Sequence, residues 1–301
     1  MTAVAGPPST TAAAPEAAPP APAPPRRRRR GPVAYAVYVG LLALVAVFLA
    51  PLLVIAINAF KSAPDFAAHG PLALPHRWQL STITRFWKQV DFGTKLLNSL
   101  EISVAVAVLG TALALLNSYA IGIGRVRGRA VFLVFFLMVN VVPQEGLVYP
   151  LYYMAKQVDL YDSKLAVIII FTVIQSAFGT YLLSSVLADF PTELIEAAEI
   201  DGANSWRTLT RIVVPMSWPT LSVMFTFFFI WTWNEFFLPL VFLVSNDKQT
   251  VPVGLAVLQG QHSMDVTATS ASALLGVLPA LLFFLVFQRT LTRGIAAGAL
   301  K

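Results

Sequence analysis

The stretch Leu165–Leu187, LAVIIIFTVIQSAFGTYLLSSVL, contains no charged side chain and is long enough to cross a lipid bilayer. A helix needs roughly 20 apolar residues to span the hydrocarbon core, and it satisfies every backbone polar group within its own segment. Five other stretches share this length and character: Val33–Ala59, Leu97–Ile121, Ala130–Met154, Trp218–Val244 and Ala268–Phe287. The sequence therefore predicts an all-α polytopic membrane protein with six transmembrane helices.

The composition agrees with a membrane protein rather than a soluble one. Of the 301 residues, 57% are hydrophobic and only 12% are charged, and the mean hydropathy is +0.71. A soluble domain of this length needs more charge to cover its surface. The net charge of +6 does not indicate nucleic-acid binding, because the basic residues border the apolar runs, where they act as an orientation signal. The absence of cysteine excludes disulfides, thiolate metal sites and cysteine nucleophiles.

The first 25 residues are almost entirely Ala, Pro, Ser and Thr, and Arg26–Arg30 follow them. Such a composition cannot bury a core, so we expect residues 1–32 to form a disordered tail and residues 33–301 to form one six-helix domain. A basic run before an apolar run is also the pattern of a secretory signal peptide. The apolar run 33–59 is too long for such a signal, which favours an uncleaved first helix.

Lys and Arg are unequally divided between the segments that join the predicted helices. If the N-terminus is cytoplasmic, the inner segments hold thirteen of these residues and the outer segments hold eight, five of which lie in one long loop. Because cytoplasmic loops carry an excess of Lys and Arg, we expect both termini to be cytoplasmic.

The inner segment 188–217, ADFPTELIEAAEIDGANSWRTLTRIVVPMS, has the pattern of a helix–turn–helix. Pro191 suits the first turn of a helix over Thr192–Ile200, and Gly202 suits a left-handed cap after it. Asn204 or Ser205 can cap a second helix, which we expect to end at Pro215. The apolar residues of that helix fall on one face: Trp206, Leu209, Ile212 and Val213.

Two features of the first inner helix favour contact with another protein. Ala197 and Ala198 are small, so a partner surface can approach them closely, and Glu193, Glu196 and Glu199 form an acidic stripe with a spacing of three. Like charges so spaced are destabilising unless cations face them, which implies a basic or polar partner groove. The alternative is an ordinary solvated loop helix.

This loop resembles the "EAA" loop of binding-protein-dependent ABC importer permeases. The residues that match stand at the family's spacing: Glu196, Ala197, Ala198, Asp201, Gly202, Ala203, Ile212 and Pro215. One departure is Val214, where the family usually has leucine. The resemblance implies that Thr192–Ile200 is a coupling helix seated in a cleft of a cytoplasmic ATPase subunit.

Further matches, in order and spacing, resemble the maltose-type and multiple-sugar permeases, and specifically the second of their two permease subunits. They are Asn98-Ser99-Leu100, Ser103, Pro150-Leu151-Tyr152, Trp233-Asn234-Glu235-Phe236, Pro239, Val251–Leu255, Gln288-Arg289, Gly294 and Gly298-Ala299. Departures occur at Asp265-Val266 and Asn117-Ser118. The resemblance implies a bacterial plasma-membrane importer of sugars with a homologous permease partner, two copies of an ATPase subunit that binds Mg-ATP, and an extracytoplasmic solute-binding protein. A permease for amino acids or phosphate, or an ion-driven secondary transporter, is the alternative.

Polar residues within the predicted spans are costly in lipid and should face the bundle interior or a cavity. They are Asn140, Gln144, Glu145, Gln175, Asn234 and Glu235. Since sugars are bound by amides and carboxylates beside aromatic faces, we expect the solute pathway to include Trp231, Trp233, Asn234 and Glu235, and also Gln144 and Glu145. Helix–helix hydrogen bonding is the alternative role. Pro143 and Pro239 can kink their helices.

Catalysis and cofactor binding have no support in the sequence. A phosphate-binding loop of the form G-x-x-x-x-G-K-[ST] is absent, so the chain is not expected to be an enzyme or to bind ATP in that manner. The segment Lys61–Pro75 has the composition of coil, and Ser81–Val90 has the pattern of a short amphipathic helix. His69 and His76 are seven residues apart with no third ligand evident, and His262 lies in another loop, so no metal site is expected.

Overall fold

The computed structural model describes residues 32–124, 126–261 and 265–299. The chain divides into two compact units, residues 1–49 and 50–301. Helix α1, Pro32–Ala59, begins in the first unit and ends in the second. The predicted N-terminal tail lies outside the described residues except for Pro32, as does His262.

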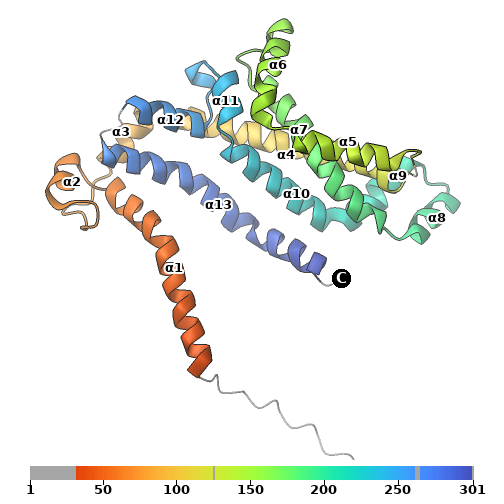
Figure 1. The fold of residues 1–301 in the computed structure, drawn as a ribbon, viewed down its shortest axis with the longest axis horizontal. Helices are drawn as coiled ribbons and strands as arrows, with labels where there is room; N and C mark the ends of the chain where they lie inside the picture. Colours follow the sequence, from red (N-terminus) through yellow and green to blue (C-terminus); the bar gives the residue numbers. More distant parts are fainter. Residues whose placement is uncertain (1–31, 125, 262–264, 300–301) are drawn as a thin grey trace, which may run out of the picture. The chain divides into compact units, whose positions relative to one another are not determined.

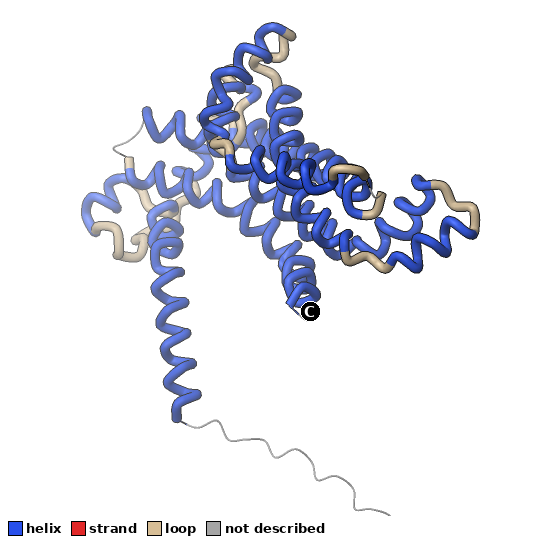
Figure 2. Tube along the Cα trace, turned by 45° about the vertical axis from the view of Figure 1, so that its right-hand side comes forward, coloured by secondary structure: helices blue, strands red, loops and turns tan. Residues whose placement is uncertain are grey.

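The second unit is helical, and no strand occurs among the described residues (Figure 2). Its helices in chain order are α2 Ala63–His69, α3 Ser81–Gln89, α4 Phe92–Gly122, α5 Arg129–Val141, α6 Gln144–Gln157, α7 Lys164–Ala188, α8 Thr192–Ile200, α9 Ser205–Thr208, α10 Val214–Asn234, α11 Phe237–Phe242, α12 Val251–Gln261 and α13 Val266–Ala299. A π-helix, Leu209–Val213, joins α9 to α10, and a 3-10 turn, Asn246–Lys248, follows α11. Helices α4, α7, α10 and α13 run beside one another (Figure 1).

Five described helices are long and apolar enough to cross a membrane, or six if α5 and α6 count as one span. The predicted third span, Ala130–Met154, is broken into two helices, because α5 and α6 meet at an angle of 94°. Pro143 accounts for the break, since it disfavours the helical conformation of the preceding residue, and Val142 is extended with ψ at 122°. The predicted kink at Pro143 is therefore confirmed.

The predicted fifth span, Trp218–Val244, is too long at its C-terminal end. Helix α10 ends at Asn234, and α11 begins only at Phe237. Pro239 explains the stop, because a proline ring clashes with the carbonyl four residues earlier, here that of Glu235. The pattern of Ser81–Val90 is confirmed as α3, but the coil predicted over Lys61–Pro75 contains α2.

Close packing of α4, α7 and α10 forms the centre of the bundle. A Cβ atom added at Gly179 would lie 2.8 Å from both Ala114 Cβ and Phe228 Cζ, so only glycine lets these helices approach so closely. Buried Gln175 donates from Nε2 to Thr232 Oγ1 at 2.8 Å, which links α7 to α10. Such hydrogen bonds hold helices together where water cannot. The structure thus gives Gln175 the helix–helix role.

Candidate functional site

Helix α8 is the first element of the loop between α7 and α10. A Schellman motif ends this helix. The N–H of Ala203 donates to the carbonyl of Ala198 at 2.9 Å, and the N–H of Gly202 donates to the carbonyl of Glu199 at 3.0 Å. Gly202 has φ of +75°, and an added Cβ would meet no atom within 4 Å. The left-handed cap predicted at Gly202 is confirmed, and the demand for glycine there is conformational rather than steric.

The second helix of the loop differs from the prediction. Asn204 caps α9, since its side-chain oxygen accepts from the N–H of Arg207 at 2.9 Å. Helix α9 passes through the π-helix into α10, so Pro215 does not end it, and Pro215 lies in the first turn of α10. The N–H of Val214 bonds to the carbonyl of Leu209, five residues back, and the wider turn accommodates the proline. Trp206 is 65% exposed and does not share the buried face of Leu209 and Val213.

The two alanines of α8 differ in burial. Ala198 is buried, with 6% of its surface exposed, whereas Ala197 and Glu196 are exposed. Ala198 therefore packs within its own chain, and of the two alanines Ala197 is the one open to a partner surface. The exposed face of α8 also includes Glu193, Glu199 and Ile200, and Ile200 is 87% exposed.

A cavity of about 570 Å3 lies between α8 and the adjoining ends of α4, α5 and α7. Glu196 and Glu199 line one side and Arg129 lines another. Within the described part of the chain, none of the three glutamates of α8 forms an ion pair. The Tyr119 hydroxyl donates to the carbonyl of Ser205 at 3.3 Å, so the loop is tied to α4. The acidic stripe is available to an external cation.

The predicted residues Asp201, Ile212 and Pro215 are placed around this loop without a shared pocket. Asp201 follows α8 and is exposed, Ile212 is half-buried in the π-helix, and Pro215 is exposed. They shape the loop rather than line its cavity.

A second cavity, of about 670 Å3, opens beside α10. Its lining includes three of the predicted solute residues, Trp231, Asn234 and Glu235, among aromatic and apolar side chains from α7, α10 and α13: Phe178, Phe227, Ile230 and Phe284. Asn234 is exposed, and its side-chain nitrogen donates only to the carbonyl of Ile230 at 2.8 Å.

The other predicted solute residues lie elsewhere. Trp233 is buried and stacks on Phe229, with ring centroids 5.8 Å apart, and it lines a smaller cavity of about 130 Å3 with Asn234. Gln144 and Glu145 begin α6, immediately after the sharp bend, and do not line either of these cavities. The structure thus groups Trp231, Asn234 and Glu235 and separates Gln144 and Glu145 from them.

At the end of the bundle opposite α8, a polar cluster that sequence reasoning missed fastens the segment after α11. Asp162 accepts hydrogen bonds from the Ser245 backbone at 3.0 Å and from Lys248 Nζ at 2.9 Å. Burial opposes ionisation of Asp162, but these bonds and the Ser245 hydroxyl outweigh it and hold its pKa at about 2. Lys164 also pairs with Glu101.

The motif Asn98-Ser99 has a structural task in this cluster. Asn98 Nδ2 donates to the carbonyls of Asp247 at 2.7 Å and Gln249 at 3.1 Å. Ser99 Oγ accepts from the N–H of Val251 at 2.8 Å and so supports the first turn of α12. Asn98-Ser99 and Val251–Leu255 were both noted as family matches in the sequence, but nothing in the sequence showed that they meet.

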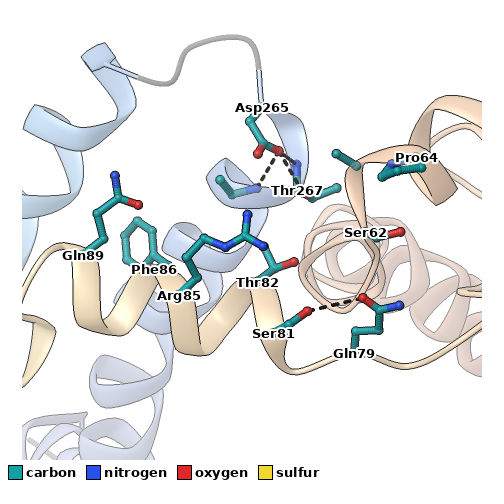
Figure 3. Close-up of a pocket in the computed structure, with 12 residues that line it drawn as sticks. Ser62, Pro64, Gln79, Ser81, Thr82, Arg85, Phe86, Gln89, Asp265 and Thr267 are labelled. Carbon is teal, nitrogen blue, oxygen red and sulfur yellow. Dashed lines mark hydrogen bonds between the residues drawn. The ribbon is translucent and has the colours of Figure 1, made fainter.

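A polar pocket of about 220 Å3 lies at the same end, between α2, α3 and the start of α13 (Figure 3). Arg85 of α3 and Asp265 before α13 both line it. Asp265 accepts from the N–H groups of Thr267 at 3.0 Å and Ala268 at 3.1 Å, and thereby caps α13. Burial raises the pKa of Asp265, but these bonds and the charge of Arg85 together lower it below its ordinary value.

A comparison with protein families assigns this chain to a family. Residues 108–295 match the model of the binding-protein-dependent transport system inner membrane component. The chain belongs to this family. The matched range includes the whole loop between α7 and α10 and the cavity residues of α10. This permease is therefore an inner-membrane transport component, and the family is not one of enzymes.

Several relatives of this permease are named as sugar-uptake proteins. It is 25% identical over 257 residues to the diacetylchitobiose uptake system permease protein NgcG of Streptomyces coelicolor, covering 85% of each chain. It is 27% identical over 263 residues to the arabinooligosaccharides transport system permease protein AraQ of Halalkalibacterium halodurans, covering 86% of this chain and 93% of that one.

A solved structure shares the fold. It is the crystal structure of a bacterial ABC transporter involved in the import of the acidic polysaccharide alginate, matched with a TM-score of 0.71 at 23% identity. The match covers 85% of this permease and 95% of that chain. The fold class predicted from the sequence, an all-α polytopic membrane protein, is confirmed.

Proposed function

We propose that this permease carries a mono- or oligosaccharide across the bacterial plasma membrane, driven by a separate ATPase subunit. Its complex contains a second, homologous permease, two copies of the ATPase subunit with bound Mg-ATP, and an extracytoplasmic solute-binding protein. The observation that carries this proposal is α8: a short helix, ended by a left-handed glycine cap, whose exposed glutamates form no ion pair among the described residues.

The proposed orientation places α8 and both termini in the cytoplasm. The division of Lys and Arg between the connecting segments supports it, and so does the match of α8 to the family's coupling loop. In this orientation Asp162, Ser245 and Lys248 lie on the outer side.

The mechanism follows from how α8 is joined to the bundle. Ile195 of α8 packs against the apolar cluster that includes Leu187 of α7 and Leu209 and Val213 of the π-helix. When ATP closes the ATPase dimer, its two clefts approach each other, and an α8 seated in one of them draws α7 and α10 along. Solute and ATP then bias the same two-state equilibrium between inward-facing and outward-facing bundles.

The solute class is inferred from the cavity of α10 and from the relatives. Trp231 offers an aromatic face, while Asn234 and Glu235 offer an amide and a carboxylate at one end of that cavity. This combination suits a sugar, which presents apolar faces and hydroxyl groups together. Gln144 and Glu145 remain predicted pathway residues at the start of α6.

The test is reconstitution with the cognate ATPase, partner permease and binding protein. Glu196→Gln should weaken co-purification of the ATPase and reduce solute-stimulated ATP hydrolysis, because it removes an exposed charge from α8. Asp247→Asn, an exposed acidic residue at the opposite end, is the matched control and should leave both unchanged. Transport of phosphate or an amino acid instead of a sugar would refute the solute class. ATP-independent, ion-driven transport would refute the proposal as a whole.

A further inference from the structure

Three potential metal ligands converge between α1 and α4, in a segment that precedes the family-matched range. Asp65 and His69 lie one turn apart on α2, and His76 returns to them after a reversal of the chain. The metal-binding atoms of the three side chains all lie within 4.8 Å of one another. The expectation that no third ligand accompanies the histidine pair is therefore wrong, because α2 turns Asp65 toward it.

The distance between Asp65 and His69 suits a small divalent ion. Asp65 Oδ1 and His69 Nδ1 are 3.0 Å apart, close to the ligand–ligand edge of roughly 3.4 Å in a tetrahedral zinc site with bonds of about 2.0 to 2.1 Å. The imidazoles of His69 and His76 lie nearly parallel, at 14°, with centroids 4.7 Å apart. Because imidazole lone pairs lie in the ring plane, one of the two stacked rings must rotate for both nitrogens to reach the same ion.

The ligand set selects among metals by its chemistry. Two imidazole nitrogens and one carboxylate are ligands that zinc, nickel and copper prefer, whereas magnesium and calcium prefer a full shell of oxygens. Three protein ligands leave a fourth tetrahedral position for water. His69 and His76 are exposed, so an ion can reach the site from the solvent.

The segment that presents the ligands is already held in place. Asn58 Nδ2 donates to the carbonyl of Pro71 at 3.0 Å, and Lys61 Nζ donates to the carbonyl of Gly70 at 2.8 Å. The N–H of Gln79 donates to the carbonyl of Phe60 at 3.0 Å, which closes the loop after His76. A ligand set held in position by such contacts loses little entropy when the metal binds.

The carboxylate of Asp65 is also oriented before any metal arrives. Its Oδ2 accepts the backbone N–H of His76 at 3.2 Å, which leaves Oδ1 directed toward His69. Partners of this kind fix the geometry of a metal ligand and raise affinity.

We propose that Asp65, His69 and His76 bind one zinc-like divalent transition-metal ion, with water in the fourth position. Bound metal pins the loop 70–79 to α2 and so stiffens the segment that leads from α1 to α3. In the proposed orientation this site lies on the outer side, but the assignment itself is independent of the transport function.

The test uses the full chain in lipid nanodiscs, with no polyhistidine tag and after treatment with a chelator. Equilibrium dialysis against ZnCl2, with the metal quantified by mass spectrometry, should give about one zinc per chain. His69→Gln and His76→Gln should each weaken binding by more than about tenfold, since even the loss of a supporting residue costs that much. Asp65→Asn keeps the shape of the side chain and should also weaken binding.

Cobalt provides a second measurement, because four-coordinate Co2+ absorbs visible light far more strongly than six-coordinate Co2+. The wild-type chain should show the intense band, and the histidine variants should lose it. His262→Gln, which removes the remaining histidine, is the matched control and should bind as the wild type does. Equal zinc binding by the wild type and a His69→Gln, His76→Gln double variant would overturn the proposal, as would loss of binding in the control.

Discussion

Replacing Gly202 tests whether the termination of α8 matters for coupling. Gly202 has φ of +75°, and no atom lies within 4 Å of a Cβ atom added there. An added side chain therefore meets no clash, and the free-energy cost of the substitution comes from the backbone conformation alone. An L-residue in this region costs roughly 1 to 2 kcal/mol, and more when it is β-branched. That free energy corresponds to a change of about 5 to 30-fold in the population of the correctly capped loop.

The side chains form a graded series. Asn tolerates the left-handed region, so Gly202→Asn should retain most of the solute-stimulated ATPase activity, whereas Gly202→Ala should lose part of it and Gly202→Val should lose most. The assay is ATP hydrolysis by the reconstituted complex, with and without binding protein and sugar, alongside quantification of bound ATPase. Membrane insertion should be unchanged throughout, because the substitution lies outside the predicted spans.

The matched control is Gly128, which also has positive φ, +85°, and no atom within 4 Å of an added Cβ. It lies between α4 and α5, outside α8. The complex with Gly128→Val should therefore retain more of the solute-stimulated ATPase activity than the complex with Gly202→Val. Equal stimulation across the whole Gly202 series would refute the coupling role of the cap. So would an Asn variant as defective as the Val variant, because the effect would then not follow the backbone penalty.

Three further predictions concern the proposed solute cavity, the core and the cluster around Asp162. Asn234→Leu should impair sugar transport while the complex still assembles; normal transport in proteoliposomes would remove Asn234 from the pathway. Gly179→Ala should lower the melting temperature, because overpacking costs about 1 to 3 kcal/mol, whereas Gly146→Ala, with open space around it, should not. Asp162 has its pKa lowered from 3.8 to about 2, so its stabilising contribution is complete above pH 3.8 and is lost as the pH falls through 2. Asp162→Asn should abolish that part of the pH dependence of thermal unfolding, and an unchanged profile would contradict the assigned contacts.

Hydropathy predicted the long helices well because it measures the one property that lipid demands. The uncharged stretch Leu165–Leu187 differs from α7 by one residue at each end. Hydropathy does not detect a bend, however, so α5 and α6 were predicted as one span although Pro143 marked the break. The end of α10 at Asn234 was missed for the same reason, because the residues beyond it remain apolar.

Local capping rules predicted the helix ends in the loop between α7 and α10, but the burial of its side chains depends on tertiary contacts. Gly202 and Asn204 carry their signals in their own backbone preferences and side chains, and both predictions are confirmed. Which face of α8 is buried depends on the neighbouring helices, so the inward direction of Ala198 was not predictable from the alanine pair. The meeting of Asp65 with His76 depends on the chain reversal between them, which composition alone presented as coil.

Helix α9, the π-helix and α10 are continuous, so a movement at one end of this long helix is transmitted to the other end. Ser205–Asn234 forms one helical rod, with a length of about 45 Å at 1.5 Å per residue. Its near end carries the loop that follows α8, and its far end carries Asn234 at the aromatic cavity. A tilt of about 10° around the near end would swing the far end by ~8 Å over such a length. A small displacement of the loop that follows α8 would thereby be amplified into a larger one at the aromatic cavity, without any relay of side-chain rearrangements between the two.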